Sequence, residues 1–244
     1  LVWSYEGNSQ ITVEISAENL VTLSAPDSNW FGSEMITFTA TDTSESSGSN
    51  QATFTVEPKN DAPLVAALSG ETIDEGSDFE TIDLNGYVED IDNDDADITW
   101  TVFGNSNIQV TVDELKVATV AALDSNWFGS ESISFVATDP GGLSDTTSAE
   151  FTILAVNDAP VISGLINQVI DEGASFPVLN LDDYVTDVDD PDSLLTWNAS
   201  GNIELQIELV NHMFTVTIPS ENWNGSETMI FAVIDTSGLQ DSIF

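Results

Sequence analysis

Cysteine and arginine are absent from this 244-residue sequence, and lysine and histidine are scarce. Two lysines and one histidine stand against 43 acidic residues, which leaves a formal charge of −41. Without cysteine, the chain forms neither disulfides nor a cysteine-based zinc site. Binding to nucleic acids or anionic membrane surfaces requires Lys and Arg to neutralise phosphates. We therefore expect no nucleic-acid partner and no membrane contact within this segment.

Long apolar runs are also missing. No stretch approaches the roughly 18 residues of a membrane span, and the first ten residues lack the charged and apolar regions of a signal peptide. We expect any export signal or anchor to lie outside this segment. Disorder is disfavoured despite the charge, because 41% of the residues are hydrophobic and 9% are aromatic, which is enough to build packed cores.

The sequence repeats itself. DSNWFGSE at 27–34 recurs unchanged at 124–131, and Trp30, Trp127 and Trp223 stand 97 and 96 residues apart. A unit of this length is typical of an immunoglobulin-like domain. The spacing predicts three modules cut from a longer array: a first module over 1–63 without its N-terminal strands, a complete middle module over 64–160, and a last module over 161–244 without its last strand.

Alternation with period two indicates strands. Three equivalent stretches carry an apolar residue at every second position, with mainly Ser and Thr between, and no stretch shows sustained helical periodicity. The apolar positions are Ile36, Phe38, Ala40, Ile133, Phe135, Ala137, Met229, Phe231 and Val233. The pattern predicts an all-β protein of tandem antiparallel sandwich modules, with these residues in the cores.

The tryptophans occupy two repeat-equivalent positions, and we interpret them as core and loop anchors rather than sugar-stacking groups. A glycine follows the second position by two residues in each module. Gly32, Gly129 and Gly225 are predicted to adopt a backbone angle that other residues resist.

Acidic residues gather at fixed places in the repeat, which solubility alone would not require. The clusters are an Asp-Glu-Gly segment, an Asp-x-Asp loop with a following Asp, the Asp that leads the Trp-Gly loop, and an Asn-Asp pair before Ala-Pro. Their candidate ligands are Glu75, Glu172, Asp90, Asp92, Asp95, Asp187, Asp189, Asp192, Asp27, Asp124, Asn60, Asp61, Asn157 and Asp158. Carboxylate and amide oxygens without His or Cys are the ligands that Ca²⁺ prefers.

As a set, these motifs resemble the cadherin-like, VCBS-type tandem repeats of large bacterial surface and secreted adhesins. ATDPGGLSD at 137–145 looks like the family's strand ending, and VNDAP at 156–160 is similar to its junction motif. The resemblance covers essentially the whole chain. It implies Ca²⁺ as the cofactor, neighbouring repeats of the same chain as partners, an extracellular or cell-surface location, and no enzymatic activity.

The resemblance further implies ion sites where one module meets the next. At the first junction the ligands would be Asp27, Asn60, Asp61, Asp90, Asp92 and Asp139. At the second junction they would be Glu75, Asp124, Asn157, Asp158, Asp187, Asp189 and Asp235. The first junction lacks the early glutamate, and the Asp-x-Glu of vertebrate repeats reads Asp-Ser-Asn here, so we expect fewer or weaker ions than in those repeats.

The predicted function is a calcium-stiffened stalk of a cell-surface adhesin. A carbohydrate-binding or homophilic adhesion module with a glycan or protein ligand is the alternative, as is an accessory region of a secreted polysaccharide-active enzyme. An EF-hand starting at Asp90 is excluded, because its sixth and twelfth positions hold Asp95 and Thr101 instead of Gly and Glu. A glycosidase site is disfavoured because the acids recur once per module.

Overall fold

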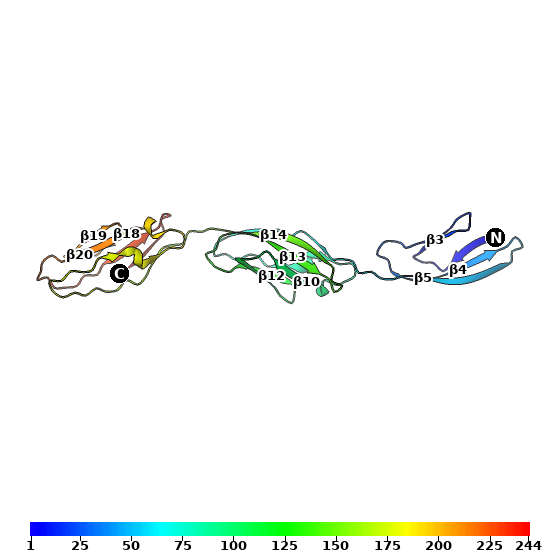
Figure 1. Cartoon of the computed structure of the whole chain (residues 1–244), viewed down its shortest axis with the longest axis horizontal. Helices are drawn as coiled ribbons and strands as arrows, with labels where there is room; N and C mark the ends of the chain where they lie inside the picture. The colour runs from blue at the N-terminus through cyan, green and yellow to red at the C-terminus, as the bar shows by residue number, and fades with distance from the viewer.

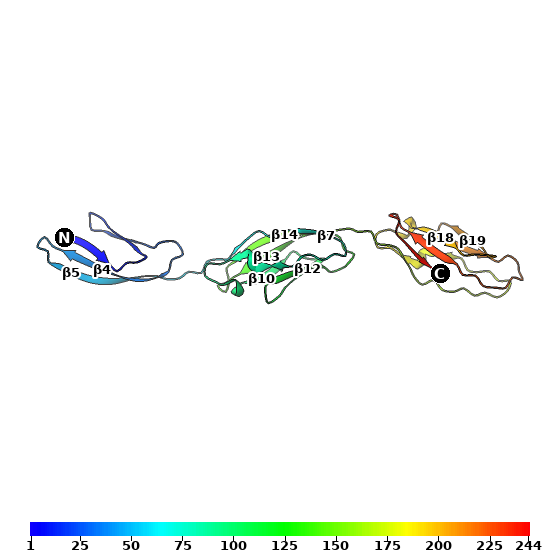
Figure 2. The ribbon, with the colours of Figure 1, turned by 180° about the vertical axis from the view of Figure 1, so that it is seen from behind.

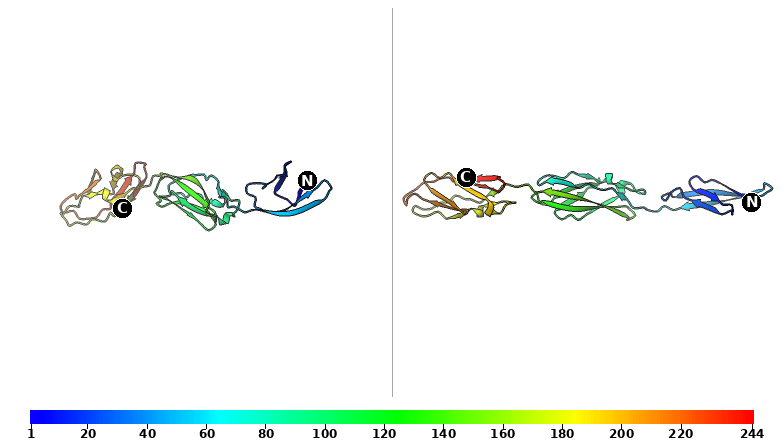
Figure 3. Two further views of the ribbon diagram at one scale, coloured as in Figure 1. Left: turned by 45° about the vertical axis from the view of Figure 1, so that its right-hand side comes forward. Right: turned by 90° about the horizontal axis from the view of Figure 1, so that it is seen from above.

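Short strands form nearly all the regular structure, and the helical elements are four 3-10 turns. The computed structural model describes residues 1–244. Three groups of strands follow one another along an extended molecule, with the N-terminus at one tip (Figure 1). The same end-to-end order is seen from behind (Figure 2) and from the further directions of Figure 3. The prediction of an all-β fold is confirmed.

The first module has two small sheets. Its strands are β1 (Val2–Glu6), β2 (Thr12–Ile15), β3 (Val21–Ser24), β4 (Gly32–Thr41) and β5 (Ser47–Val56). Strand β4 lies between β1 and β5, antiparallel to both, and β2 pairs with β3.

The middle module has the fullest set of strands. Its elements are β6 (Leu64–Val65), β7 (Glu71–Asp74), β8 (Ile82–Asp83), η1 (Leu84–Tyr87), β9 (Val88–Glu89), η2 (Asp95–Asp97), β10 (Thr99–Phe103), β11 (Ile108–Val112), β12 (Val117–Ala122), β13 (Gly129–Thr138) and β14 (Ser144–Leu154). The sheets have the orders β10-β13-β14-β7, β11-β12-β8 and β6-β9. All pairs are antiparallel except β7, which joins β14 in parallel.

The last module repeats most of this plan. Its elements are β15 (Val161–Ile162), β16 (Leu179–Asn180), η3 (Leu181–Tyr184), β17 (Val185–Thr186), η4 (Asp192–Leu194), β18 (Thr196–Ser200), β19 (Gln206–Val210), β20 (Met213–Thr217), β21 (Ile230–Ile234) and β22 (Gln240–Ile243). The sheets have the orders β18-β21-β22, β16-β20-β19 and β15-β17. No element matches β7.

Each core lies between facing sheets, and its size follows the number of strands. The core cluster of the middle module contains 15 buried apolar residues, that of the last module 8 and that of the first module 3. Most of the alternating residues predicted for the cores lie there. Ile36, Ile133, Phe135, Ala137, Phe231 and Val233 are buried, and Phe38 and Met229 pack against the clusters. Ala40 is half-buried and lies outside the cluster of the first module.

The Trp-Gly loops need their glycines for two reasons. Gly129 has φ +146°, and a Cβ atom there would lie 2.8 Å from Cζ2 of Trp127, whose ring packs on it. Gly32 has φ +150° and meets Trp30 in the same way. The prediction of a special backbone angle is confirmed at these two positions and wrong at Gly225, which has no positive φ. Gly225 instead leaves room for the indole of Trp223, because a Cβ atom there would lie 3.0 Å from Cζ2 of the ring.

One glutamate per module, here called the clamp glutamate, holds a loop against the sheet. Oε1 of Glu131 accepts hydrogen bonds from the Ser106 hydroxyl and from the Asn107 N–H, and Oε2 accepts from the N–H groups of Ser106 and Ile108 at 2.9 and 3.2 Å. Burial alone would raise the pKa of Glu131, but these hydrogen bonds lower it to about 2. Glu34 and Glu227 make the equivalent contacts with the loops at 9–11 and 203–205.

Candidate metal centre at the module junctions

The first linker is bonded to the loops at the near end of the middle module. Nδ2 of Asn60 donates to Oδ2 of Asp139 at 2.7 Å, and the Asp61 N–H donates to Oδ2 of Asp92 at 2.7 Å. The Asp92 N–H in turn donates to Oδ1 of Asp90 at 2.8 Å. Five of the predicted ligands therefore lie in one connected network.

The second junction repeats the network with equivalent residues. Asn157 donates to Asp235 at 2.6 Å, and the Asp158 N–H donates to Asp189 at 2.7 Å. The Asp189 N–H donates to Oδ1 of Asp187 at 2.9 Å. The same geometry at both junctions follows from the repeated Asn-Asp and Asp-x-Asp motifs.

Glu75 adds a contact that the first junction does not have. Its Oε2 accepts from the Val156 N–H at 3.0 Å, and its own N–H donates to the Leu154 carbonyl at 2.9 Å. The second linker is thus held from the middle module by Glu75 and from the last module by Asp189 and Asp235.

Three oxygen atoms beside these networks are buried and have no hydrogen-bond partner. They are Oδ2 of Asp90, Oδ1 of Asn93 and Oδ2 of Asp187. The other two unpartnered buried atoms are the indole nitrogens of Trp100 and Trp197. A buried acceptor without a partner costs about 1–3 kcal/mol, and more when it is charged. A cation bound beside Asp90 and Asp187 would satisfy their free oxygens, so the donor set fits a hard metal ion.

Asn93 differs from its counterpart Asp190 for a local reason. Oδ2 of Asp190 accepts from the N–H and hydroxyl of Thr236. The residue after Asp139 is Pro140, which has neither an N–H nor a hydroxyl group. The Asn93 oxygen is consequently left without a donor at the first junction.

Asp139 and Asp235 are the most deeply buried of the predicted ligands, at 5% and 6% exposure. Burial alone would raise the pKa of Asp139, but the Asn60 amide and backbone N–H groups of the following turn lower it below its ordinary value. Asn157 and the turn after Asp235 lower the pKa of Asp235 in the same way. Both carboxyl groups are therefore ionised at neutral pH.

The remaining predicted ligands are more peripheral. Asp27 and Asp124 each close a turn by accepting the N–H of the second following residue, Asn29 or Asn126. The Asp124 turn precedes Gly129, and Gly129 pairs with Ile153 near the end of β14. The turn therefore lies at the end of the middle module that faces the second linker. Asp95 and Asp192 begin η2 and η4 and are exposed, and Glu172 is exposed beside the turn that joins Asp171 to Ala174.

The predicted ligands thus belong to hydrogen-bond networks, but they do not surround one common metal position. No group of three or more acidic or histidine side chains converges closely enough to hold a metal ion. Each junction carboxylate instead accepts hydrogen bonds from backbone or side-chain amide N–H groups.

Two contributors were missed from the sequence. The Val65 N–H donates to Asp145 and the Ile162 N–H donates to Asp241, so each carboxylate fixes the strand that follows a linker. The signal was their recurrence at equivalent positions, after Gly-Leu-Ser and Gly-Leu-Gln.

Sequence comparison identifies these modules. The bacterial Ig domain family matches residues 60–152 and 157–243. The chain belongs to this family. No curated protein matches the sequence. Bacterial Ig domains in tandem are typically non-catalytic and generally extracellular or surface-exposed. None of the helical turns in this Ig array is long and apolar enough to cross a membrane.

Solved structures align with the Ig array along nearly its whole length. The PcdhgB3 EC1-4 fragment aligns with a TM-score of 0.51 at 14% identity, covering 99% of this chain and 64% of that one. Extracellular cadherin domains 1-4 of protocadherin gamma B7 give 0.47 at 18% identity, covering 100% and 65%. The endo-fucoidan hydrolase MfFcnA4 gives 0.36 at 18% identity, covering 99% and 37%. This chain spans less than two thirds of each structure, and the first of them shows a shared fold alone.

Proposed function

We propose that this chain is a calcium-stiffened stalk of an extracellular surface protein, that it binds Ca²⁺ at its module junctions, and that it has no enzymatic activity. One observation carries the proposal. At each junction one buried carboxylate oxygen has no hydrogen-bond partner; it belongs to Asp90 at the first junction and to Asp187 at the second. It lies in the loop that is hydrogen-bonded to the linker. The proposal also takes the modules to be 1–63, 64–160 and 161–244, with the acidic and amide residues named above as ligands.

The charge of the chain explains why a cation would matter. Two carboxylates about 5 Å apart repel by roughly 3 kcal/mol at an effective dielectric constant of 20. Several of them at one linker would push neighbouring modules apart in a chain of net charge −41. A divalent cation reverses the sign of this interaction and, at a hundredfold excess over Kd, adds about 2.7 kcal/mol of stability.

The linker contacts would turn ion binding into stiffness. Asn157 and Asp158 are bonded to carboxylates of the last module, while Val156 is bonded to Glu75 of the middle module. An ion that holds Asp187, Asp189 and Glu75 together would fix both sides of the linker at once.

Isothermal titration and small-angle scattering test the proposal together. We expect saturable Ca²⁺ uptake, and a larger radius of gyration with Ca²⁺ than with a chelator. The double variant Asp187→Asn/Asp189→Asn should lose the uptake at the second junction. Glu14→Gln/Glu208→Gln removes the same charge from exposed strand positions and is the matched control. Absence of uptake by the unmodified chain, or equal loss in both variants, would refute a specific site.

A further inference from the structure

The two junctions differ at the turn that follows the buried aspartate. The turn has the same form in both modules, since the carbonyl groups of Asp139 and Asp235 each accept the N–H of the third following residue. Its second position is Pro140 in the middle module and Thr236 in the last module. Proline suits this position of a turn because its φ is fixed, but it has no N–H to donate. The donors that the turn offers to its surroundings therefore differ between the junctions.

At the second junction, the donors of Thr236 are used on Asp190. The Thr236 N–H and hydroxyl both donate to Oδ2 of Asp190, at 3.0 and 2.7 Å. A carboxylate oxygen has two lone pairs, so these two hydrogen bonds occupy both of them. This oxygen has no lone pair left for a cation.

At the first junction, the equivalent oxygen is free. Asn93 occupies the position of Asp190, three residues after the first aspartate of the Asp-x-Asp loop. Oδ1 of Asn93 and Oδ2 of Asp90 are both buried, and neither accepts a hydrogen bond. The Asn93 N–H donates to Oδ1 of Asp90 at 3.0 Å, so both free oxygens belong to one tight loop. The second junction has one such oxygen, Oδ2 of Asp187.

We propose that Asn93 is a Ca²⁺ ligand at the first junction, together with Asp90, and that Pro140 is a positioning residue that leaves the Asn93 oxygen free. The inference rests on the proposed function, because it adds a ligand to the ion assigned to this junction. Side-chain amide oxygens bind Ca²⁺ alongside carboxylates. At the second junction, Thr236 engages the equivalent oxygen of Asp190. The residue after the buried aspartate thus decides whether the loop supplies two free oxygens or one.

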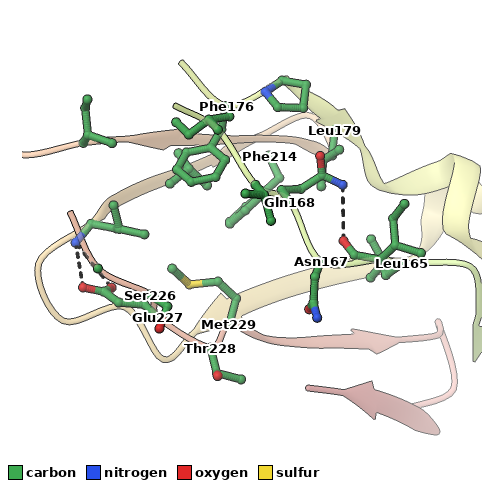
Figure 4. Close-up of a pocket in the computed structure, with 18 of the residues that line it drawn as sticks. Leu165, Asn167, Gln168, Phe176, Leu179, Phe214, Ser226, Glu227, Thr228 and Met229 are labelled. Atoms are coloured by element: carbon green, nitrogen blue, oxygen red, sulfur yellow. Dashed lines mark hydrogen bonds between the residues drawn. The ribbon is translucent and has the colours of Figure 1, made fainter. Parts of the chain in front are cut away.

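Isothermal titration of the whole chain with Ca²⁺ tests the ligand. The background is Asp187→Asn/Asp189→Asn, which confines uptake to the first junction. In this background, Asn93→Ala should weaken the affinity about tenfold, the size expected for one polar contact with a charged partner. Asn167→Ala is the matched control and should leave the affinity unchanged, because Asn167 is an exposed residue of the last module, on the wall of the pocket in Figure 4.

Exchange with threonine tests Pro140. Pro140→Thr supplies an N–H and a hydroxyl to Asn93 and should weaken Ca²⁺ binding, whereas Pro140→Ala supplies the N–H alone and should weaken it less. Both variants lose the proline ring, so their difference reports the hydroxyl. In chains that carry Asn93→Ala, Pro140→Thr should have no further effect, because the two residues act through one oxygen.

The reverse exchange is made at the second junction, in an Asp90→Asn/Asp92→Asn background. Thr236→Pro removes both donors from Asp190. The affinity for Ca²⁺ should rise, and the melting temperature of the chelator-treated chain should fall, since a half-buried carboxylate loses its hydrogen bonds. A purely structural role of Thr236 would lower the melting temperature without raising the affinity.

Failure of this inference can be told from failure of the proposed function. Unchanged affinity in Asn93→Ala would overturn the ligand role, and equal effects of Pro140→Thr with and without Asn93 would overturn the role of Pro140, while ion uptake at the junctions would stand. No uptake by the Asp187→Asn/Asp189→Asn background would refute the junction site itself. Circular dichroism shows which variants fold. If Asn93→Ala does not, Asn93→Asp keeps the side-chain size, adds a charge and should bind Ca²⁺ more tightly.

Discussion

Replacing Glu131 by Gln is expected to destabilise the middle module strongly although it changes only one terminal group of the side chain. The carboxylate accepts five hydrogen bonds from the loop at 106–108, three on Oε1 and two on Oε2. Gln keeps one acceptor oxygen and turns an NH₂ group toward two of the donors. Hydrogen bonds to a charged group contribute about 1.5–3 kcal/mol each, so losing two lowers the free energy of unfolding by roughly 3 kcal/mol or more.

Thermal unfolding followed by circular dichroism measures this loss. For a module of this size, 1 kcal/mol corresponds to about 4–8 °C, so the melting temperature of the middle module should fall by roughly 12–24 °C. Glu150→Gln removes the same charge from an exposed position on the adjacent strand and should leave stability within about 0.5 kcal/mol. A Glu131→Gln variant that melts within 2–3 °C (about 0.5 kcal/mol) of the unmodified chain would refute the clamp.

Three further predictions follow from other contacts. Acid should unfold the modules between about pH 4.5 and 2, because the pKa values of Glu34 and Glu131 fall from 4.5 in the unfolded chain to about 2 in the folded one. The stability that these two carboxylates contribute is complete above that range and is lost within it. An acid titration followed by tryptophan fluorescence checks this. Asp187→Asn should reduce the shift in melting temperature caused by Ca²⁺ while leaving the chelator-treated chain at least as stable, since it removes the negative charge from a buried group that has no hydrogen-bond partner. Gly129→Ala should cost about 1–3 kcal/mol in urea unfolding, because a Cβ atom would both strain φ +146° and press on Trp127; an unchanged midpoint would contradict the packing described.

Much of the fold could be predicted because its signals are local and repeated. Alternating apolar residues identified the core strands, and identical motifs at a constant step indicated a tandem repeat. The hydrogen-bond networks at the junctions were predictable in part for the same reason, because Asn60 and Asn157 occupy identical motifs and donate to equivalent aspartates. The prediction of a special backbone angle at Gly225 was wrong, because the role of this glycine depends on where the indole of Trp223 packs.

By itself, the sequence determined the all-β class, the module length, the family and the places where acids gather, since each depends on residue type and spacing along one chain. Only the tertiary structure decided which oxygen atoms find partners. Oδ1 of Asp90 accepts two N–H groups while Oδ2 accepts none. Oδ1 of Asn93 has no donor because Pro140 occupies the position that Thr236 has in the last module.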